Sequence, residues 1–126
     1  MKDVYGLLPL LMLGIFSGCA KPDRVDRINS PVTGLFITVE TRYGRGAIAA
    51  DFTRVYAHLE ANGKSDESLV LDGEYLQDTK VIWLNPHEVT LCIPQGATDS
   101  FRNLLTLRAG GVSQTIRTHL QEHCNS

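Results

Sequence analysis

Residues 80–93 read Lys80-Val81-Ile82-Trp83-Leu84-Asn85-Pro86-His87-Glu88-Val89-Thr90-Leu91-Cys92-Ile93. Two apolar runs flank the polar segment Asn85-Pro86-His87. Asn85 and Pro86 suit the first two positions of a type I turn, because Asn bonds back to the backbone and Pro holds φ at about −65°. The stretch therefore predicts a β-hairpin in which residues 80–84 pair with residues 88–93.

The first strand of this hairpin carries apolar side chains on both faces. Val81 and Trp83 point one way, and Ile82 and Leu84 point the other. A strand without a polar face is typical of the centre of a sheet or of a strand covered on both sides. We expect this position for residues 80–84 and a core role for Trp83, with a ligand platform as the alternative for that side chain.

Other strands follow from alternation and from turn residues. Residues 35–42 alternate apolar and polar side chains, and residues 69–71 form a short apolar run between polar segments. Residues 103–108 and 112–120 predict a second hairpin with the three-residue loop Ala109-Gly110-Gly111. Residues 96–100 predict a polar loop.

Residues 48–61 fit two structures. Their apolar side chains fall at helical spacing, and Asn62-Gly63 would end a helix. The run Phe52-Thr53-Arg54-Val55-Tyr56, however, is rich in strand formers. We favour a strand and keep the helix as the alternative.

About six or seven short strands separated by turns predict the fold class. The chain should be mainly β, a single small antiparallel sandwich or open barrel. The alternative is an α+β fold with a helix at 48–61.

The first nineteen residues have the features of an export signal. Lys2 supplies a positive start, residues 7–16 are apolar, and Ser17-Gly18-Cys19 follows. The apolar run is shorter than the roughly 20 residues of a membrane-spanning helix. The end of this segment resembles the lipobox of bacterial lipoproteins.

That resemblance implies that residues 1–18 are removed and that Cys19 carries the lipid anchor. It also implies a domain that faces the periplasm. Ala20 stands where Asp would resemble an inner-membrane retention signal, so we expect the outer membrane. The competing interpretation is an ordinary cleaved signal that releases a soluble protein.

The segment after the signal is polar. Residues 20–31 contain two prolines and five charged side chains, so we interpret residues 19–33 as the lipidated cysteine with a flexible tether. Such a tether could extend up to about 40 Å. Residues 34–124 should form a single β-rich domain.

The cysteine count predicts one disulfide. Assigning Cys19 to the lipid leaves Cys92 and Cys124, and exported proteins reach compartments where disulfides persist. A bond between them would close a loop of about 33 residues and contribute on the order of 3–4 kcal/mol. The alternative is two free thiols.

Composition and motifs argue against several function classes. The net charge is −2 with interspersed signs, which does not favour nucleic-acid binding. Asp51 and His58 could belong to a hydrolytic triad, but no Gly-x-Ser-x-Gly pattern accompanies them. His119, His123 and Cys124 could bind zinc only on a helix, whereas the segment predicts a strand. We expect no cofactor, no metal and no enzyme.

Arg42, Tyr43 and Arg45 form the cluster most typical of a recognition surface, the alternative being a charged hairpin tip. The layout after Ser30-Pro31 is also similar to small periplasmic all-β lipoproteins of unknown function. The signal, the short tether and the absence of a catalytic motif lead us to expect a lipid-anchored, non-enzymatic envelope protein that binds a partner, possible partners including another envelope protein. The alternatives are a small periplasmic hydrolase or metal-binding protein, and a structural envelope component.

Overall fold

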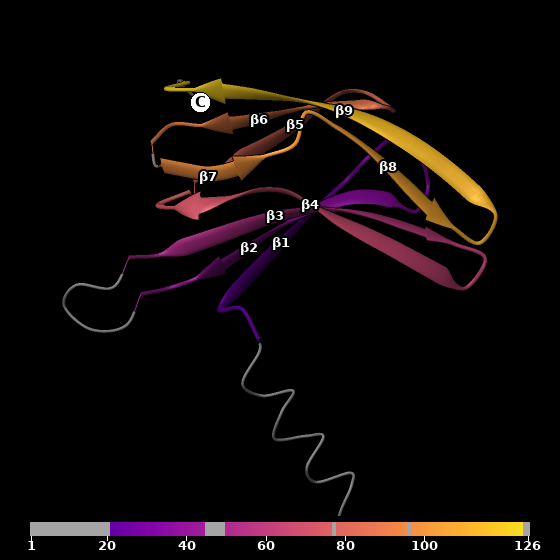
Figure 1. The fold of residues 1–126 in the computed structure, drawn as a ribbon, viewed down its shortest axis with the longest axis horizontal. Coiled ribbons are helices and arrows are strands. Elements are labelled where there is room, and N and C mark those ends of the chain that lie inside the picture. Colours follow the sequence, from indigo (N-terminus) through magenta and orange to yellow (C-terminus); the bar gives the residue numbers. More distant parts are fainter. Residues whose placement is uncertain (1–20, 45–49, 77, 96, 125–126) are drawn as a thin grey trace, which may run out of the picture.

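The computed structural model describes residues 21–44, 50–76, 78–95 and 97–124. Within these residues the chain forms nine β-strands in two stacked sheets (Figure 1). The strands are β1 (Arg24–Asn29), β2 (Leu35–Arg42), β3 (Phe52–Ala61), β4 (Lys64–Glu74), β5 (Lys80–Asn85), β6 (Glu88–Ile93), β7 (Ala97–Phe101), β8 (Leu104–Ala109) and β9 (Val112–Glu122).

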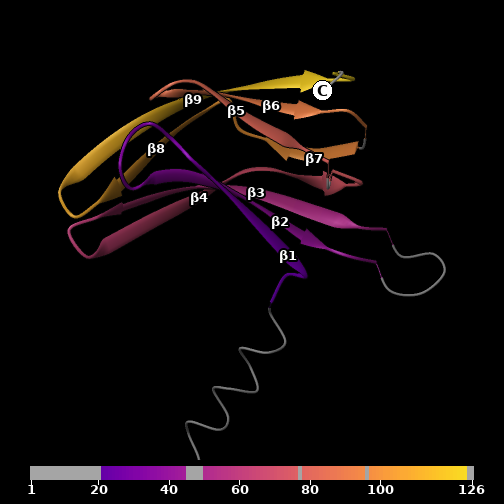
Figure 2. The same ribbon diagram turned by 180° about the vertical axis from the view of Figure 1, so that it is seen from behind.

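One sheet has five strands in the order β1-β2-β3-β4-β7, and the other has four in the order β5-β6-β9-β8. Figure 2 shows β1 along the edge of the five-stranded sheet. The predicted mainly-β sandwich is confirmed, and the sheets do not close into a barrel. The prediction of an antiparallel fold needs one correction, because β6 and β9 are parallel.

The core lies between the two sheets. Strand residues alternate, so every second side chain points inward and is buried. In β8, for example, Leu105 and Leu107 are buried, whereas Thr106 between them is exposed. The innermost large side chains are Leu35, Ile37, Leu59, Leu71, Leu76, Leu91, Ile93, Leu107, Ile116, Val55, Val70 and Val89.

Residues 52–61 form a strand, as the favoured interpretation predicts. β3 pairs with β2 on one side and with β4 on the other. Its burial alternates, with Val55, Ala57 and Leu59 inside the core. This two-residue period satisfies both neighbouring ladders, which a helix could not do.

The N-terminal boundary of the domain differs from the prediction. Residues 24–29 fall within the predicted tether (19–33), but they form β1, which pairs with β2 from Arg24 opposite Thr41 to Asn29 opposite Phe36. Ile28 packs against the core. The charged composition suits an edge strand, where charges discourage pairing with other chains. The folded domain thus begins before residue 34.

The predicted hairpin at 80–93 is present, but β5 is an edge strand and not a central one. Val81 and Trp83 pack against the core, whereas Ile82 and Leu84 are 49% and 57% exposed. The prediction was wrong because it required both faces of this apolar strand to be covered. The outward face of β5 is open.

Two hairpin loops are shorter than expected, and the strands around them are longer. Asn62-Gly63 and Gly110-Gly111 each have positive φ at both residues, the pattern of a two-residue type I′ turn. β4 therefore begins at Lys64 and includes most of the predicted polar turn. Residues 97–101, predicted as a loop, form β7 and pair with β4.

Cys92 and Cys124 form the predicted disulfide, with their Cα atoms 6.0 Å apart. Cys92 lies near the end of β6, and Cys124 follows β9. Because β6 and β9 are parallel neighbours, the two strands end on the same side of the sheet. The disulfide therefore holds the end of the domain to β6.

Candidate functional site

The outer face of the five-stranded sheet carries a set of side chains that contact one another across four strands. Strand register brings them together, since Arg27 lies opposite Thr38, Phe36 opposite His58, and His58 opposite Glu67. We call this set the outer-face cluster, and its members are Arg27, Phe36, Thr38, Tyr56, His58 and Glu67.

Phe36 is at the centre of the cluster. It points away from the core, yet it is only 6% exposed. The Arg27 guanidinium lies 3.6 Å from the centre of its ring, and the His58 ring stacks on it at 4.7 Å with an interplanar angle of 6°. Cation–π and stacking contacts thus cover an aromatic side chain on a face that points away from the core.

His58 is held by two polar neighbours. Its Nε2 shares a hydrogen bond of 2.7 Å with the Thr38 hydroxyl, and its Nδ1 lies 3.5 Å from Oε2 of Glu67. Burial lowers the pKa of His58 below its usual value, while the Glu67 carboxylate acts in the opposite direction. The imidazole is therefore mainly neutral at pH 7.

The structure does not bring together Asp51 and His58, the two residues considered for a triad and disfavoured by the sequence. Asp51 precedes β3, and its Oδ1 accepts a hydrogen bond from the Gly44 amide at 2.8 Å. It lies seven positions before His58, a distance of about 23 Å along an extended chain.

Three neighbouring side chains do follow one another as the nucleophile, base and acid of a triad would. They are Thr38, His58 and Glu67. An acyl-transfer site also needs N–H groups that point at the developing oxyanion. β2 lies between β1 and β3, and its backbone groups pair with both neighbours. Thr38 itself is only 6% exposed. This geometry suits a contact surface better than a nucleophile.

The predicted surface at Arg42, Tyr43 and Arg45 lies at one end of the same sheet. Arg42 ends β2 opposite Phe52, while Tyr43 is 45% exposed and its amide donates to Oδ2 of Asp23 at 2.7 Å. Arg45 lies outside the described residues. The Arg54 guanidinium sits 5.3 Å from the Phe52 ring.

Arginine–aromatic contacts thus occur at two places on one sheet face. Sequence reasoning missed most of them. The signal was the alternation of Phe52, Arg54, Tyr56 and His58, which share the outer face of β3 once its register is known.

Beside the outer-face cluster is an open hollow with a volume of ≈ 460 Å³. Its lining residues are His58, Glu60, Ser65, Asp66 and Glu67. Three of these five side chains are carboxylates, so the hollow suits a cationic group of a partner. Two of the carboxylates already have partners, because Oδ2 of Asp66 accepts a hydrogen bond from the Arg108 amide and Oε2 of Glu67 lies 3.5 Å from Nδ1 of His58.

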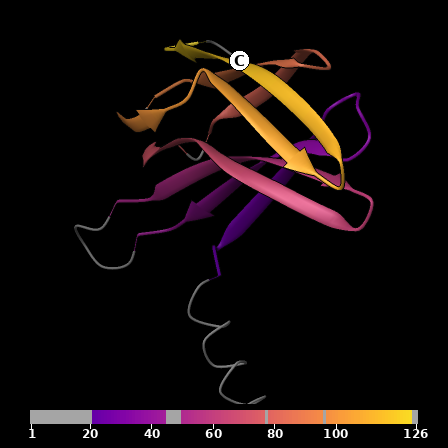
Figure 3. The same cartoon turned by 45° about the vertical axis from the view of Figure 1, so that its right-hand side comes forward.

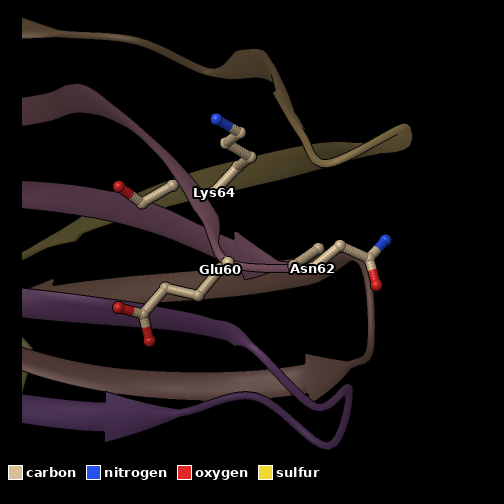
Figure 4. Close-up of a pocket in the computed structure, with 6 residues that line it drawn as sticks. Glu60, Asn62 and Lys64 are labelled. Carbon is tan, nitrogen blue, oxygen red and sulfur yellow. The ribbon is translucent and has the colours of Figure 1, made fainter.

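A second hollow lies at the tip of the β3–β4 hairpin (Figure 4). Glu60 and Lys64 point to opposite sides of the tip, and Asn62 points away from both. The charged groups therefore do not converge on one point. This hollow is a weaker site than the one beside His58.

The structure does not bring His119, His123 and Cys124 together as zinc ligands, the possibility that the sequence disfavoured. Nε2 of His119 donates to Oε2 of Glu88 at 2.6 Å, and Cys124 is in the disulfide. The hydrogen bond from His119 lowers the pKa of the Glu88 carboxyl. Across the part of the chain that the structure describes, no group of three or more His, Cys, Asp or Glu side chains could hold a metal ion.

In comparisons with known proteins, the chain matches no family model, no curated protein and no solved structure. Cys19 and the predicted signal lie outside the described residues. Among the residues that are described, no helix is long and apolar enough to cross a membrane.

Proposed function

We propose that this protein is a lipid-anchored protein of the bacterial cell envelope that binds another envelope protein through its outer-face cluster. The anchor would be the lipid on Cys19, and the domain would lie in the periplasm. The signal-like residues 1–18 and the Ser17-Gly18-Cys19 sequence support this address. The Cys92–Cys124 disulfide is compatible with an oxidising compartment.

The observation that carries the binding role is the stack of Arg27, Phe36 and His58. A sandwich needs only solvated polar residues on its outer faces. Here the outer face holds an ordered arginine–aromatic stack, although ordering a long arginine side chain costs conformational entropy. Arginine and aromatic residues are the types that contribute most at protein interfaces.

The charge pattern on this face indicates what kind of partner would fit. Arginines lie over β1, β2 and β3, whereas the hollow beside His58 is lined with carboxylates. A partner surface that offers an acidic group to the arginines and a basic group to the hollow would match both parts. This complementarity favours a protein partner over a uniformly charged polymer.

Ala20 favours the outer membrane within this proposal. Stable attachment requires more than one acyl chain, because each buried methylene contributes only about 0.8 kcal/mol and a single chain binds marginally. The two or three chains of a mature lipoprotein meet this requirement.

Site-specific photo-crosslinking in intact cells tests the binding role. A photoreactive amino acid replaces Arg54 on the outer face of the five-stranded sheet, or Thr115 on the outer face of the other sheet. We expect a discrete crosslinked protein from position 54 and none from position 115. We also expect Arg27→Gln to weaken the product from position 54, since that substitution removes the cation over Phe36.

The control for folding is the Cys92–Cys124 disulfide, which should form in every variant. Equal crosslinking from positions 54 and 115 would contradict the proposed surface. So would a position-54 product that Arg27→Gln leaves unchanged.

A further inference from the structure

Two described edge strands, β5 and β8, carry no charge at their centres. β8 is covered, because it packs against β3 and β4 of the other sheet and the Arg108 amide donates to Oδ2 of Asp66. Edge strands usually avoid pairing with other chains by means of charged residues, prolines or very short length. β1 contains Arg24, Asp26 and Arg27, and β7 has only five residues. β5 has Lys80 at its start, followed by four apolar residues.

The geometry of β5 leaves it ready to pair. Its register with β6 is regular from Lys80 to Trp83 and shifts only between Trp83 and Asn85. The outward side chains of Ile82 and Leu84 are 49% and 57% exposed. The inward side chains of Val81 and Trp83 are only partly buried, so another strand beside β5 would cover both faces.

We propose that β5 pairs antiparallel with β5 of a second copy of this chain, around a two-fold axis at Ile82. The two four-stranded sheets would then form one continuous sheet. Residues opposite one another in an antiparallel pair share a face. Ile82 would meet Ile82 of the other copy on the outer face, and Val81 would meet Trp83 on the inner face.

The self-complementary sequence identifies the partner as a second copy. In this register Lys80 lies opposite Leu84, where its aliphatic stem can cover the leucine while its ammonium group stays in water. No two like charges face each other. A symmetric pairing of two identical strands also satisfies the free backbone groups of both edges at once.

The direction of the chain is compatible with membrane attachment, a step that rests on the proposed function. The two-fold axis of such a pair is perpendicular to the sheet, so both five-stranded sheets lie on the same side of it. The chain enters β1 from the side of that sheet away from the four-stranded sheet (Figures 1, 2 and 3). Both lipid anchors could therefore enter one membrane.

Membrane attachment would also compensate for the small size of the contact. A single strand pair buries less than the roughly 1,200 Å² of a stable interface in solution. Two anchored copies meet at a raised effective concentration, which favours weak pairing without new contacts.

Thiol crosslinking of the full-length protein in membranes tests the proposal. Ile82→Cys and Leu104→Cys each place a thiol on the outer face of an edge strand of the same sheet, at side chains that are 49% and 53% exposed in the parent. With a short bifunctional thiol reagent we expect a covalent homodimer from Ile82→Cys, at least about tenfold more than from Leu104→Cys. The unsubstituted protein should give no crosslinked homodimer.

A charge-pair experiment tests the position of the axis. Ile82→Lys and Ile82→Glu should each abolish co-purification of two differently tagged copies, because like charges would oppose each other at the axis. Co-expressing the two variants should restore it. Leu104→Lys should leave it unchanged.

Three results would overturn the proposal: equal crosslinking from both cysteine variants, no crosslinking from Ile82→Cys, or its crosslinking to a different protein. Failure of the charge pair to restore association would exclude a two-fold axis at Ile82. The crosslinking is repeated with Cys19→Ser added to Ile82→Cys. This distinguishes failure of the strand-pairing proposal from failure of the lipid-anchor proposal. Membrane retention of Cys19→Ser would contradict lipidation, while the Ile82→Cys result would still decide the pairing.

Discussion

Nδ2 of Asn62 donates a hydrogen bond of 2.7 Å to the carbonyl oxygen of Gly110. This bond joins the tips of two hairpins, β3–β4 in one sheet and β8–β9 in the other. The two tips lie side by side at one end of the molecule (Figures 1 and 3). A Cβ atom at Gly110 would lie 2.1 Å from the carbonyl oxygen of Ala61. The contact therefore requires a glycine.

Gly110→Ala should destabilise the domain more than Gly111→Ala does. Both glycines have positive φ, so each substitution adds backbone strain of about 1 kcal/mol. A Cβ at Gly111 would meet nothing within 4 Å, whereas one at Gly110 would force the hairpin tips apart. We expect a loss of roughly 2–4 kcal/mol for Gly110→Ala. Urea unfolding of both variants measures the difference, and equal losses would contradict the role of the contact.

Stability should depend on pH through His58. Its pKa is lowered in the folded state by burial, so the unfolded chain takes up the proton at a higher pH, near 6.5. Above this pH the contribution of His58 to the free energy of unfolding should be fully present. It should fall as the pH decreases from 6.5 through the lower folded pKa, and then change no further on account of this group.

His58→Gln should remove this part of the pH dependence. Unfolding of the parent and the variant between pH 7.5 and 5 isolates the contribution of His58, because the other histidines are present in both. An identical slope in the two proteins would mean that His58 is not the responsible group.

Removing the disulfide should cost about 3–4 kcal/mol. The Cys92–Cys124 bond closes a loop across β7, β8 and β9, and the cost follows from the entropy that the unfolded chain regains. Replacing both cysteines with alanine should lower the urea midpoint without changing the strand content. Adding a reductant to the parent should give a similar shift. No shift in either case would exclude a stabilising disulfide.

Cys19→Ser should release the protein from membranes. If the lipid on Cys19 is the anchor, the variant should move to the soluble periplasmic fraction, while Cys92 and Cys124 still pair. The parent should float with outer-membrane vesicles on a density gradient. Parent protein in the inner-membrane fraction would contradict the assignment based on Ala20, and a membrane-bound variant would contradict lipidation itself.

Local signals predicted much of the fold. The hairpin at 80–93 and the one ending at residue 120 each depend on a turn whose residues are adjacent in sequence. β1 was missed because its charges look like a linker, and only its pairing with β2 reveals a strand. The edge position of β5 could not be predicted, because the order of strands in a sheet is set by contacts between distant segments.

The outer-face cluster was hidden for a similar reason. Phe36 and His58 are 22 residues apart, and Arg27 lies on a third strand. Their contacts need the register of two strand pairs at once. The sequence pattern indicated an arginine–aromatic surface near Arg42, but it could not show that the surface continues across the sheet to Arg27.

If Cys19 carries a lipid anchor, the early start of β1 limits how far the protein can act from the membrane. Only four residues separate Cys19 from Arg24, where the folded domain begins. Fully extended, this connection spans about 16 Å, against about 40 Å for the tether expected from composition. A lipid on Cys19 would hold the domain within about one domain diameter of the bilayer surface. Its partner would have to lie at the same membrane. The protein would therefore act at that surface and would not connect the two membranes across the periplasm.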